Sequence, residues 1–458
     1  MRMRFASFFK GPKGFGSPRR MFWVALVARL LVITIGHTYR MRALMDHFQF
    51  GWEMGRIARA LATGQGFANP FNAPSGPTAW TPPLYPLILC GVFKLFGVYT
   101  LKSGWVILAI NSVLSAAAAP AVYEMAWRCF GRDREGRINP QGMKVALWSG
   151  WLWALYPAAM QYAVHWVWDM SLTVALFAWT LVFALRIRGI GDPVGQAERG
   201  GFQTARHWAI FGILWGLVGL SNSSLFTFLP FCGMWMVWPE LKPRLALALR
   251  NAMLSAACCA VVLSPWIVRN WLVFHAFIPM RSTMGAELYQ SVLPSNQGFP
   301  WGPTLPMAPS DPRFQQYLRM GEVAYAKHQG ELARPIIWAN KLRLAGYVLR
   351  RIDFFWVSVP HPVDKSLFTE VVRESNYAFL SLAALLGLAL ALHRRQPAAW
   401  LFFWAFLTIP LIYYLITVQA RFRHPLEPIM TILIVYLFQS AERPHPHRQH
   451  AHAQGERP

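Results

Sequence analysis

The segment LYPLILCGVFKLFGV, residues 84–98, decides how the chain is threaded through a membrane. It is apolar but only about 15 residues long, whereas a membrane-spanning helix needs about 20 residues. If it crossed, the basic loop that contains Arg128, Arg132 and Lys144 would lie outside, against the tendency of Lys and Arg to stay in the cytoplasm. We therefore expect this segment to be re-entrant or interfacial, which leaves the basic loop cytoplasmic.

The composition is typical of a protein whose main solvent is lipid. Hydrophobic residues make up 55% of the chain and charged residues 14%, compared with about 25% charged residues in soluble proteins. The formal net charge is +24, but the positive residues lie in short loops between apolar blocks, where they indicate topology. The composition therefore predicts an all-α polytopic membrane protein and argues against a nucleic-acid partner.

Keeping that segment out of the spans places every other basic loop in the cytoplasm. A basic N-terminus at residues 1–21, which leads into an uncleaved signal anchor, and a disordered tail at 441–458 are expected on the same side. The membrane domain, 22–440, then has two long loops on the opposite face, at about 39–83 and 272–375. The expected spans are at about 22–38, 104–126, 145–163, 170–188, 207–221, 224–238, 251–270, 376–392, 397–417 and 424–440.

Cysteine and histidine spacing predicts neither disulfides nor a metal centre. Four cysteines lie in apolar segments, Cys129 flanks one, and the long polar loops contain none. No His and Asp cluster has the spacing of metal ligands, so we assign no metal site. The sequence leaves a divalent metal open as a cofactor.

Ionisable side chains gather on the face that is expected to lie away from the cytoplasm. Asp46 and Glu53 lie in the first loop, and Asp169 precedes a helix in WVWDMSL. Arg269 ends a span in SPWIVRN, and Arg421 lies in ARFRHPLEP. Ionisable residues at membrane depth are costly and usually have a functional reason, so their grouping on one face indicates a site.

Each of these residues also has a structural interpretation. Asp169 is suited to cap the helix that follows it, where the helix dipole favours an acid. Glu53 has Arg56 and Arg59 within pairing reach on one helix. The arginines at span ends are suited to anchoring at the membrane interface.

The first outer loop also carries a recurring pattern of short motifs. Residues 51–98 read GWEMGRIARALATGQGFANPFNAPSGPTAWTPPLYPLILCGVFKLFGV, with Ile-Ala at 57–58, a Gly-rich turn at 64–66, Pro-Pro-Leu-Tyr at 82–85 and Phe-Lys-Leu-Phe-Gly at 93–97. This run resembles the first outer loop of family 39 glycosyltransferases of the GT-C fold, which include the lipid A aminoarabinose transferases and the protein O-mannosyltransferases. The resemblance implies a GT-C type helical bundle with two long non-cytoplasmic loops.

Three further segments resemble the same family, so the resemblance covers nearly the whole chain. They are YPAAMQYAVHWVWDMSL with Asp169, PWIVRNWLVFHAFIPMRSTMGAELY with Arg269, and RFRHPLEP with Arg421. The chain departs from the aminoarabinose and mannosyl relatives at an Asp-Glu pair seven residues before the Ile-Ala, where it has Phe50-Gly51. The acids that remain are Glu53, which we favour slightly, and Asp46.

The resemblance implies a reaction in which a sugar leaves a polyprenyl-phosphate carrier, with inversion, for a lipid, glycan or protein acceptor outside the cytoplasm. That chemistry needs a carboxylate to accept the acceptor's proton and cations to stabilise the departing phosphate. We expect Glu53 or Asp46 to be the base and Asp169 to be a second carboxylate. The expected substrate-binding residues, for which the planar fork of arginine is well suited, are Arg269, Arg281, Arg421, Arg423, His424 and Tyr85.

Other functions remain as alternatives. A transporter or flippase would carry charges inside its spans and a repeat between its halves, and the sequence has neither feature. A membrane-embedded polymerase or ligase of surface polysaccharide would also use a lipid carrier. A non-catalytic subunit stays open because the Asp-Glu pair is missing. In each case we expect a multi-pass protein of the cell membrane.

Overall fold

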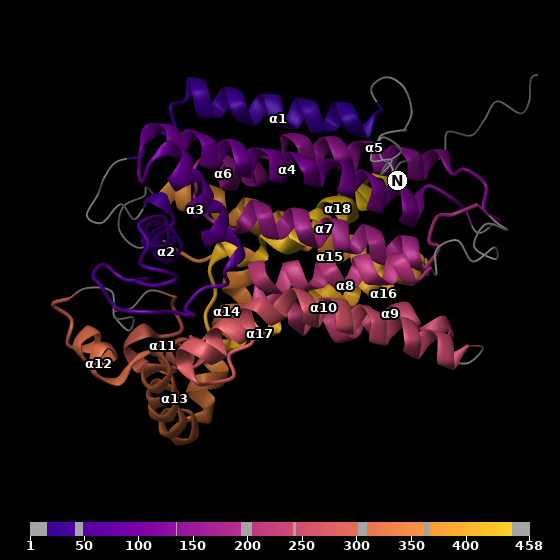
Figure 1. The fold of residues 1–458 in the computed structure, drawn as a ribbon. Helices are drawn as coiled ribbons and strands as arrows, with labels where there is room; N and C mark the ends of the chain where they lie inside the picture. The colour runs from indigo at the N-terminus through magenta and orange to yellow at the C-terminus, as the bar shows by residue number, and fades with distance from the viewer. Residues whose placement is uncertain are drawn as a thin grey trace, which may run out of the picture.

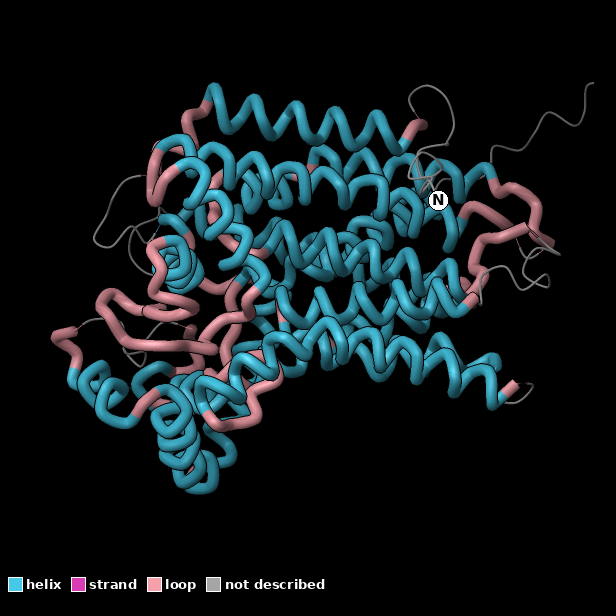
Figure 2. Tube along the Cα trace, viewed as in Figure 1, coloured by secondary structure: helices cyan, strands magenta, loops and turns pink. Residues whose placement is uncertain are grey.

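The computed structural model describes residues 16–41, 49–133, 135–193, 204–240, 244–300, 309–360 and 367–441. This part of the chain is helical, without β-strands, and forms a helical bundle with further helices gathered at one end (Figures 1 and 2). The helices of the bundle are α1 (Pro18–Ile35), α4 (Leu101–Phe130), α5 (Pro140–Leu155), α6 (Pro157–Val164), α7 (Met170–Ile187), α8 (Ala205–Ser221), α9 (Leu229–Val237), α10 (Leu245–Phe274), α15 (Leu367–His393), α16 (Ala399–Thr408), α17 (Leu411–Leu415) and α18 (Glu427–Ala441). The gathered helices are α2 (Trp52–Ala62), α3 (Leu84–Phe96), α11 (Met284–Val292), α12 (Pro312–Met320), α13 (Glu322–Ala339) and α14 (Lys341–Val357). Short 3-10 helices are η3 (Ser223–Thr227), η4 (Trp238–Glu240), η5 (Pro294–Asn296) and η6 (Ala420–Leu426).

Each expected span falls on one helix or on two helices separated by a break, except 224–238, which falls on η3, α9 and the start of η4. Pro157 separates α5 from α6, and Pro410 separates α16 from α17, because proline has no N–H to continue the helical hydrogen bonds. Four helices of the described chain, α4, α7, α10 and α15, are long and apolar enough to cross a membrane. At 30 residues, α10 is about 45 Å long, which exceeds an apolar core of about 30 Å. It is therefore longer than a perpendicular crossing requires.

The bundle has two chemically different ends. At one end, Arg128 donates to the carbonyl of Ile190 (2.9 Å), and Arg394 lies over the ring of Tyr436. This basic end holds the short loops rich in arginine. At the other end, which we call the loop end, the start of α7 meets the end of α8 through a 2.8 Å hydrogen bond between the hydroxyls of Thr173 and Ser221. The loop end lies at the left in Figure 1, together with α2, α3 and α11–α13.

The segment that was decisive in the sequence forms α3, which stays at the loop end. Trp105, near the start of α4, donates its indole N–H to the hydroxyl of Thr34, near the end of α1 (3.2 Å). The chain between these two residues therefore leaves the bundle and returns to it at the same end, and α3 does not run from one end of the bundle to the other. Its Leu89 and Phe93 are buried against α2 and α4.

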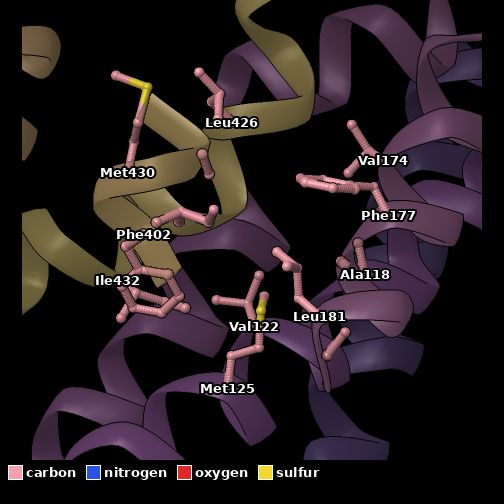
Figure 3. Close-up of a cluster of buried hydrophobic side chains, with 14 of the residues drawn as sticks. Ala118, Val122, Met125, Val174, Phe177, Leu181, Phe402, Leu426, Met430 and Ile432 are labelled. Atoms are coloured by element: carbon pink, nitrogen blue, oxygen red, sulfur yellow. The ribbon is translucent and has the colours of Figure 1, made fainter. Parts of the chain in front are cut away.

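Small residues allow the central helices to pack closely. Figure 3 shows side chains of α4, α7, α16, η6 and α18 meeting in one cluster, in which Ala118 of α4 lies near Leu181 of α7. A Cβ atom on Gly212 of α8 would lie 2.1 Å from the carbonyl oxygen of Ser255 in α10. Such contacts are typical of membrane helices, which associate through close packing of small residues.

Candidate active site

The main cavity, with a volume of about 710 Å³, lies at the loop end. Its walls come from the start of α2, the segment before α7, the turn around η3, the 281–290 region, and the chain from α17 to η6. The ionisable residues that line it are Glu53, Asp169, Arg281, Glu287, Asp311 and Arg421. Four of the residues predicted from the sequence thus meet at one place, although they come from four separate segments.

Glu53 reaches the cavity from the first turn of α2. The preceding Gly51 has φ of 104°, and a Cβ atom there would lie 2.6 Å from the carbonyl oxygen of Val167. Glycine at this position therefore allows the first loop to contact the segment that carries Asp169. Within the described chain Glu53 has no hydrogen bond or ion pair, so the expected alternative of pairing with Arg56 or Arg59 is not seen.

Asp169 is the most buried acid of the cavity, with 6% of its surface exposed. It occupies the capping position of α7, but its side chain makes no capping hydrogen bond. The hydroxyl of Thr173 donates to it at 3.5 Å. Burial raises the pKa of Asp169 to about 6, while the charges of Arg421 and Arg281 oppose that rise. A carboxylate with this pKa titrates close to neutral pH.

Arg421 is held by its flat face. Its guanidinium carbon lies 4.0 Å from the centre of the Trp168 ring, and that ring stacks on Trp166 at 4.5 Å with an interplanar angle of 5°. Cation–π contact of this kind attracts a guanidinium to an indole without using its N–H groups. Among the described residues Arg421 has no hydrogen-bond or ion-pair partner, so its donors remain available to a ligand.

Arg281 forms another part of the wall. Its Nε donates to the carbonyl of Trp80 (3.2 Å), and it pairs with Glu287. Asp311 is likewise paired, with Arg313 at 2.8 Å. Glu53, Asp169 and Arg421 are therefore the cavity's ionisable groups without a direct ionic partner in the described chain.

Arg269 does not line the cavity. Its guanidinium donates to the carbonyls of Thr78 (2.7 Å) and Phe67 (2.8 Å) in the first loop, and it lies over the rings of Phe67 and Trp266. These contacts fasten the first loop to the end of α10. The predicted contact of Arg269 with a phosphate stays a prediction.

Arg423 and His424 also lie away from the cavity lining, inside the bundle. Arg423 donates to the hydroxyl of Ser381 (2.8 Å) and the carbonyl of Tyr377 (3.2 Å), and it lies 3.5 Å from a carboxylate oxygen of Glu427. Nδ1 of His424 lies 2.6 Å from the other oxygen of Glu427. Both side chains are committed to holding η6 against α15 and α18.

Two further expected residues stand apart from the cavity's chemistry. Tyr85 is buried in α3, where its hydroxyl donates to Asn111 (3.2 Å), whose amide in turn donates to the carbonyl of Trp166 (3.1 Å). Tyr85 therefore supports the segment before α7 through Asn111. Asp46 lies outside the described residues.

Glu322, at the start of α13, joins the two long loops and was missed in the sequence. Its buried carboxylate accepts hydrogen bonds from the hydroxyl of Thr78 (2.5 Å), the N–H of Ala79 (2.6 Å), the hydroxyl of Ser282 (2.7 Å) and the hydroxyl of Tyr317 (2.9 Å). The residues next to these partners, Trp80 and Arg281, line the cavity. Nothing in the local sequence distinguishes Glu322 from the other acids of a polar helix, because its partners lie far away in the chain.

We expect Glu322→Gln to destabilise the docking of the two loops. The amide keeps one acceptor oxygen and turns an N–H group toward the two donors that met the other oxygen. Each buried donor left without an acceptor costs about 1–3 kcal/mol. Thermal unfolding followed by tryptophan fluorescence should show a lower midpoint than in the matched variant Glu135→Gln, whose side chain is 64% exposed at the basic end. Equal midpoints for the two variants would contradict this role.

The described residues do not form a group that would hold a metal. No three His, Cys, Asp or Glu side chains in this part of the chain are arranged to bind one ion. The cavity's acids are spread over different walls, and two of them are paired with arginines.

Solved structures of other proteins are similar to this fold. No protein-family model and no curated protein sequence matches the chain. The crystal structure of the Archaeoglobus fulgidus oligosaccharyltransferase with Zn and sulfate is similar, with a TM-score of 0.51 and 14% identity over 92% of this chain and 49% of that one. The archaeal oligosaccharyltransferase AglB from the same organism, in complex with an inhibitory peptide and a dolichol-phosphate, gives the same score and identity over 92% and 50%.

The likeness to AglB shows that the chain has the GT-C fold, as its helical bundle and gathered loop helices indicate. The chain spans about half of the length of that oligosaccharyltransferase. ArnT from Cupriavidus metallidurans bound to undecaprenyl phosphate matches over 92% of this chain and 77% of that one, at 15% identity. Its TM-score of 0.39 is too low to support the fold assignment.

Proposed function

We propose that the chain is a membrane glycosyltransferase that moves a sugar from a polyprenyl-phosphate carrier to an acceptor, with inversion at the anomeric carbon. The observation that carries the proposal is Arg421, whose N–H donors have no partner in the described chain and which lines the main cavity. The planar fork of an arginine matches two oxygens of a phosphate. Glu53 and Asp169 line the same cavity, which supplies carboxylates beside the proposed phosphate site.

In the proposed reaction, the acceptor's hydroxyl oxygen attacks the anomeric carbon on the face opposite the phosphate. The new C–O bond forms as the bond between that carbon and the phosphate oxygen breaks, and the hydroxyl proton passes to Glu53. The phosphate leaves with the bonding electrons, and Arg421 stabilises the charge that develops on it. Asp169 orients Arg421 by its charge, and Asp46 is the alternative base.

The identity of the carrier rests on the fold and on the cavity's chemistry. AglB, which shares the fold, has been solved with a dolichol-phosphate. That fact concerns AglB, and we extend it to this chain because an unpaired arginine at a cavity suits a lipid-linked phosphate. The acceptor is proposed to be a lipid, a glycan or a protein.

We propose that the site lies on the non-cytoplasmic side of the cell membrane. The short loops at the basic end contain Arg132, Arg137, Arg394 and Arg395, and short loops rich in arginine are retained in the cytoplasm. The cavity lies at the opposite end of the bundle. Placing the basic end inside therefore places the cavity outside.

The test is a transfer assay in membranes that contain the chain. Radiolabelled polyprenyl-phosphate sugars are supplied to right-side-out and inside-out vesicles, and the lipid, glycan and protein fractions are then separated. With the wild-type chain we expect label in one fraction. The label should appear sooner in right-side-out vesicles than in inside-out vesicles. With the double variant Glu53→Gln, Asp169→Asn we expect no label.

Other outcomes identify the alternatives. A flippase would move the labelled carrier across the vesicle membrane without transferring the sugar. A non-catalytic subunit would do neither, and the double variant would behave as the wild type does. Either result would overturn the proposed reaction.

A further inference from the structure

A second cavity lies beside the main one and plays no part in the proposed transfer step. Its volume is about 410 Å³, and it is formed by the 277–282 segment, α11 and α13. Arg281 lines both cavities. The two spaces are therefore neighbours that share one arginine in their walls.

The second cavity carries an excess of positive charge. Lys327 and Arg334 of α13 line it together with Arg281, against a single acid, Glu331. The α13 residues are spaced by four and by three positions, which places them on one face of the helix. Neither Lys327 nor Arg334 has a hydrogen bond or an ion pair in the described part of the chain. Their charges are thus available to an anion.

The rest of the cavity wall is apolar and closely packed. Ile278, Leu288 and Val323 line it. A Cβ atom on Gly285 of α11 would lie 1.9 Å from the carbonyl oxygen of Ala326 in α13, so glycine allows these two helices to form a shared wall. A ligand that fits has both an anionic group and an apolar part.

The apolar side of this cavity continues toward the end of α10. Phe277 lines the cavity with 71% of its surface exposed, and Leu272, in the last turn of α10, is 68% exposed. Since α10 is long and apolar enough to cross a membrane, its exposed end is where a membrane-borne molecule would approach. An amphipathic ligand can therefore reach the cationic cavity from the bilayer.

We propose that the second cavity binds the anionic group of the acceptor, and that the acceptor is an amphipathic molecule carrying a phosphate or carboxylate. This inference rests on the proposed function. The leaving phosphate is assigned to Arg421 in the main cavity, so Lys327 and Arg334 form a separate anion site. Arg281, between the two sites, brings the acceptor next to the reacting carbon.

The test measures binding without requiring transfer. Purified protein in a neutral detergent is titrated calorimetrically with dihexanoyl phosphatidic acid, with dihexanoyl phosphatidylcholine and with inorganic phosphate. We expect the anionic lipid to bind most tightly, and its affinity to fall about tenfold, or about 1.4 kcal/mol, in the double variant Lys327→Gln, Arg334→Gln. The matched control, Lys341→Gln with Arg343→Gln, removes the same charge from an exposed part of α14 and should keep the wild-type affinity.

Three results would overturn the proposal. They are an unchanged affinity in the cavity variant, an equal loss in the α14 control, and inorganic phosphate binding as tightly as the anionic lipid. Arg421→Gln separates this inference from the proposed function, because it should lower the transfer rate by a factor of about 10²–10³ and leave the binding of phosphatidic acid intact. Where transfer is measured, the cavity variant should raise the KM for the acceptor and leave the KM for the donor unchanged.

Discussion

Replacing Glu53 with glutamine is expected to lower the rate of sugar transfer by a factor of about 10²–10⁴, the range that a positioned general base contributes. Glutamine keeps the shape of the side chain and cannot accept the acceptor's proton. Because Glu53 has no hydrogen bond in the described chain, the change should leave the fold and the binding of the donor unaltered. Initial rates at saturating donor, with Glu135→Gln as the control, measure the effect.

Asp169→Asn tests the second carboxylate through its pH dependence. Burial raises the pKa of Asp169 to about 6, so in the wild type this residue gains a proton as the pH falls through that value. The transfer rate should therefore fall below about pH 6 in the wild type, and that fall should disappear in the Asn variant, whose rate is low throughout. If Glu53→Gln, Asp46→Asn and Asp169→Asn all transfer sugar at the wild-type rate, the proposed mechanism is wrong.

Arg421→Gln should reduce the transfer rate by a factor of about 10²–10³, as is usual when one donor to a developing charge is removed. The loss should appear in kcat, because charge on the phosphate grows as the bond to the sugar breaks. Binding of farnesyl phosphate, a short lipid phosphate, should also weaken. Single-turnover rates and direct titration separate the two effects.

Two comparison variants sharpen this prediction. Arg421→Lys keeps the positive charge and loses the planar fork, so its rate should lie between those of the wild type and the Gln variant. Trp168→Leu removes the ring that supports the guanidinium and should resemble the Lys variant. Arg343→Gln, on the exposed face of α14, should transfer at the wild-type rate. Equal rates for Arg421→Gln and Arg343→Gln would contradict the phosphate role.

The helices and their arrangement were largely predictable from the sequence. The apolar blocks located the helices of the bundle because a bilayer sets the length of a crossing helix, and the distribution of arginine predicted that residues 84–98 do not cross. The hydrogen bond between Trp105 and Thr34 agrees with that expectation. The breaks at Pro157 and Pro410 were not predicted, because neighbouring helices let a membrane helix tolerate proline.

The site was predictable in part. Glu53, Asp169, Arg281 and Arg421 meet at the cavity, as their common face suggested. Arg423 lies two positions from Arg421 in a 3-10 turn, where residues two apart point to different sides, and it is buried beside Glu427 in place of lining the cavity. The sequence alone could not decide which of the two arginines faces a ligand.

Longer-range contacts account for the other differences. Arg269 contacts carbonyl groups of the first loop, and backbone carbonyls leave no signature in a sequence. Of the Phe50-Gly51 pair, which departs from the Asp-Glu of the resembling family, Gly51 is explained by its close approach to Val167. A side chain at that position would separate the loop from the segment that carries Asp169.

The main cavity is walled by α2, which is made early during synthesis, and by η6, which is made after almost all of the bundle. Chains fold from the N-terminus as they emerge from the ribosome. A nascent chain that has inserted α1 to α15 therefore has most of its helices and still lacks the wall that holds Arg421. The proposed phosphate site at Arg421 therefore forms only after η6 has been made, whereas α11 and α13, which line the second cavity, are made earlier.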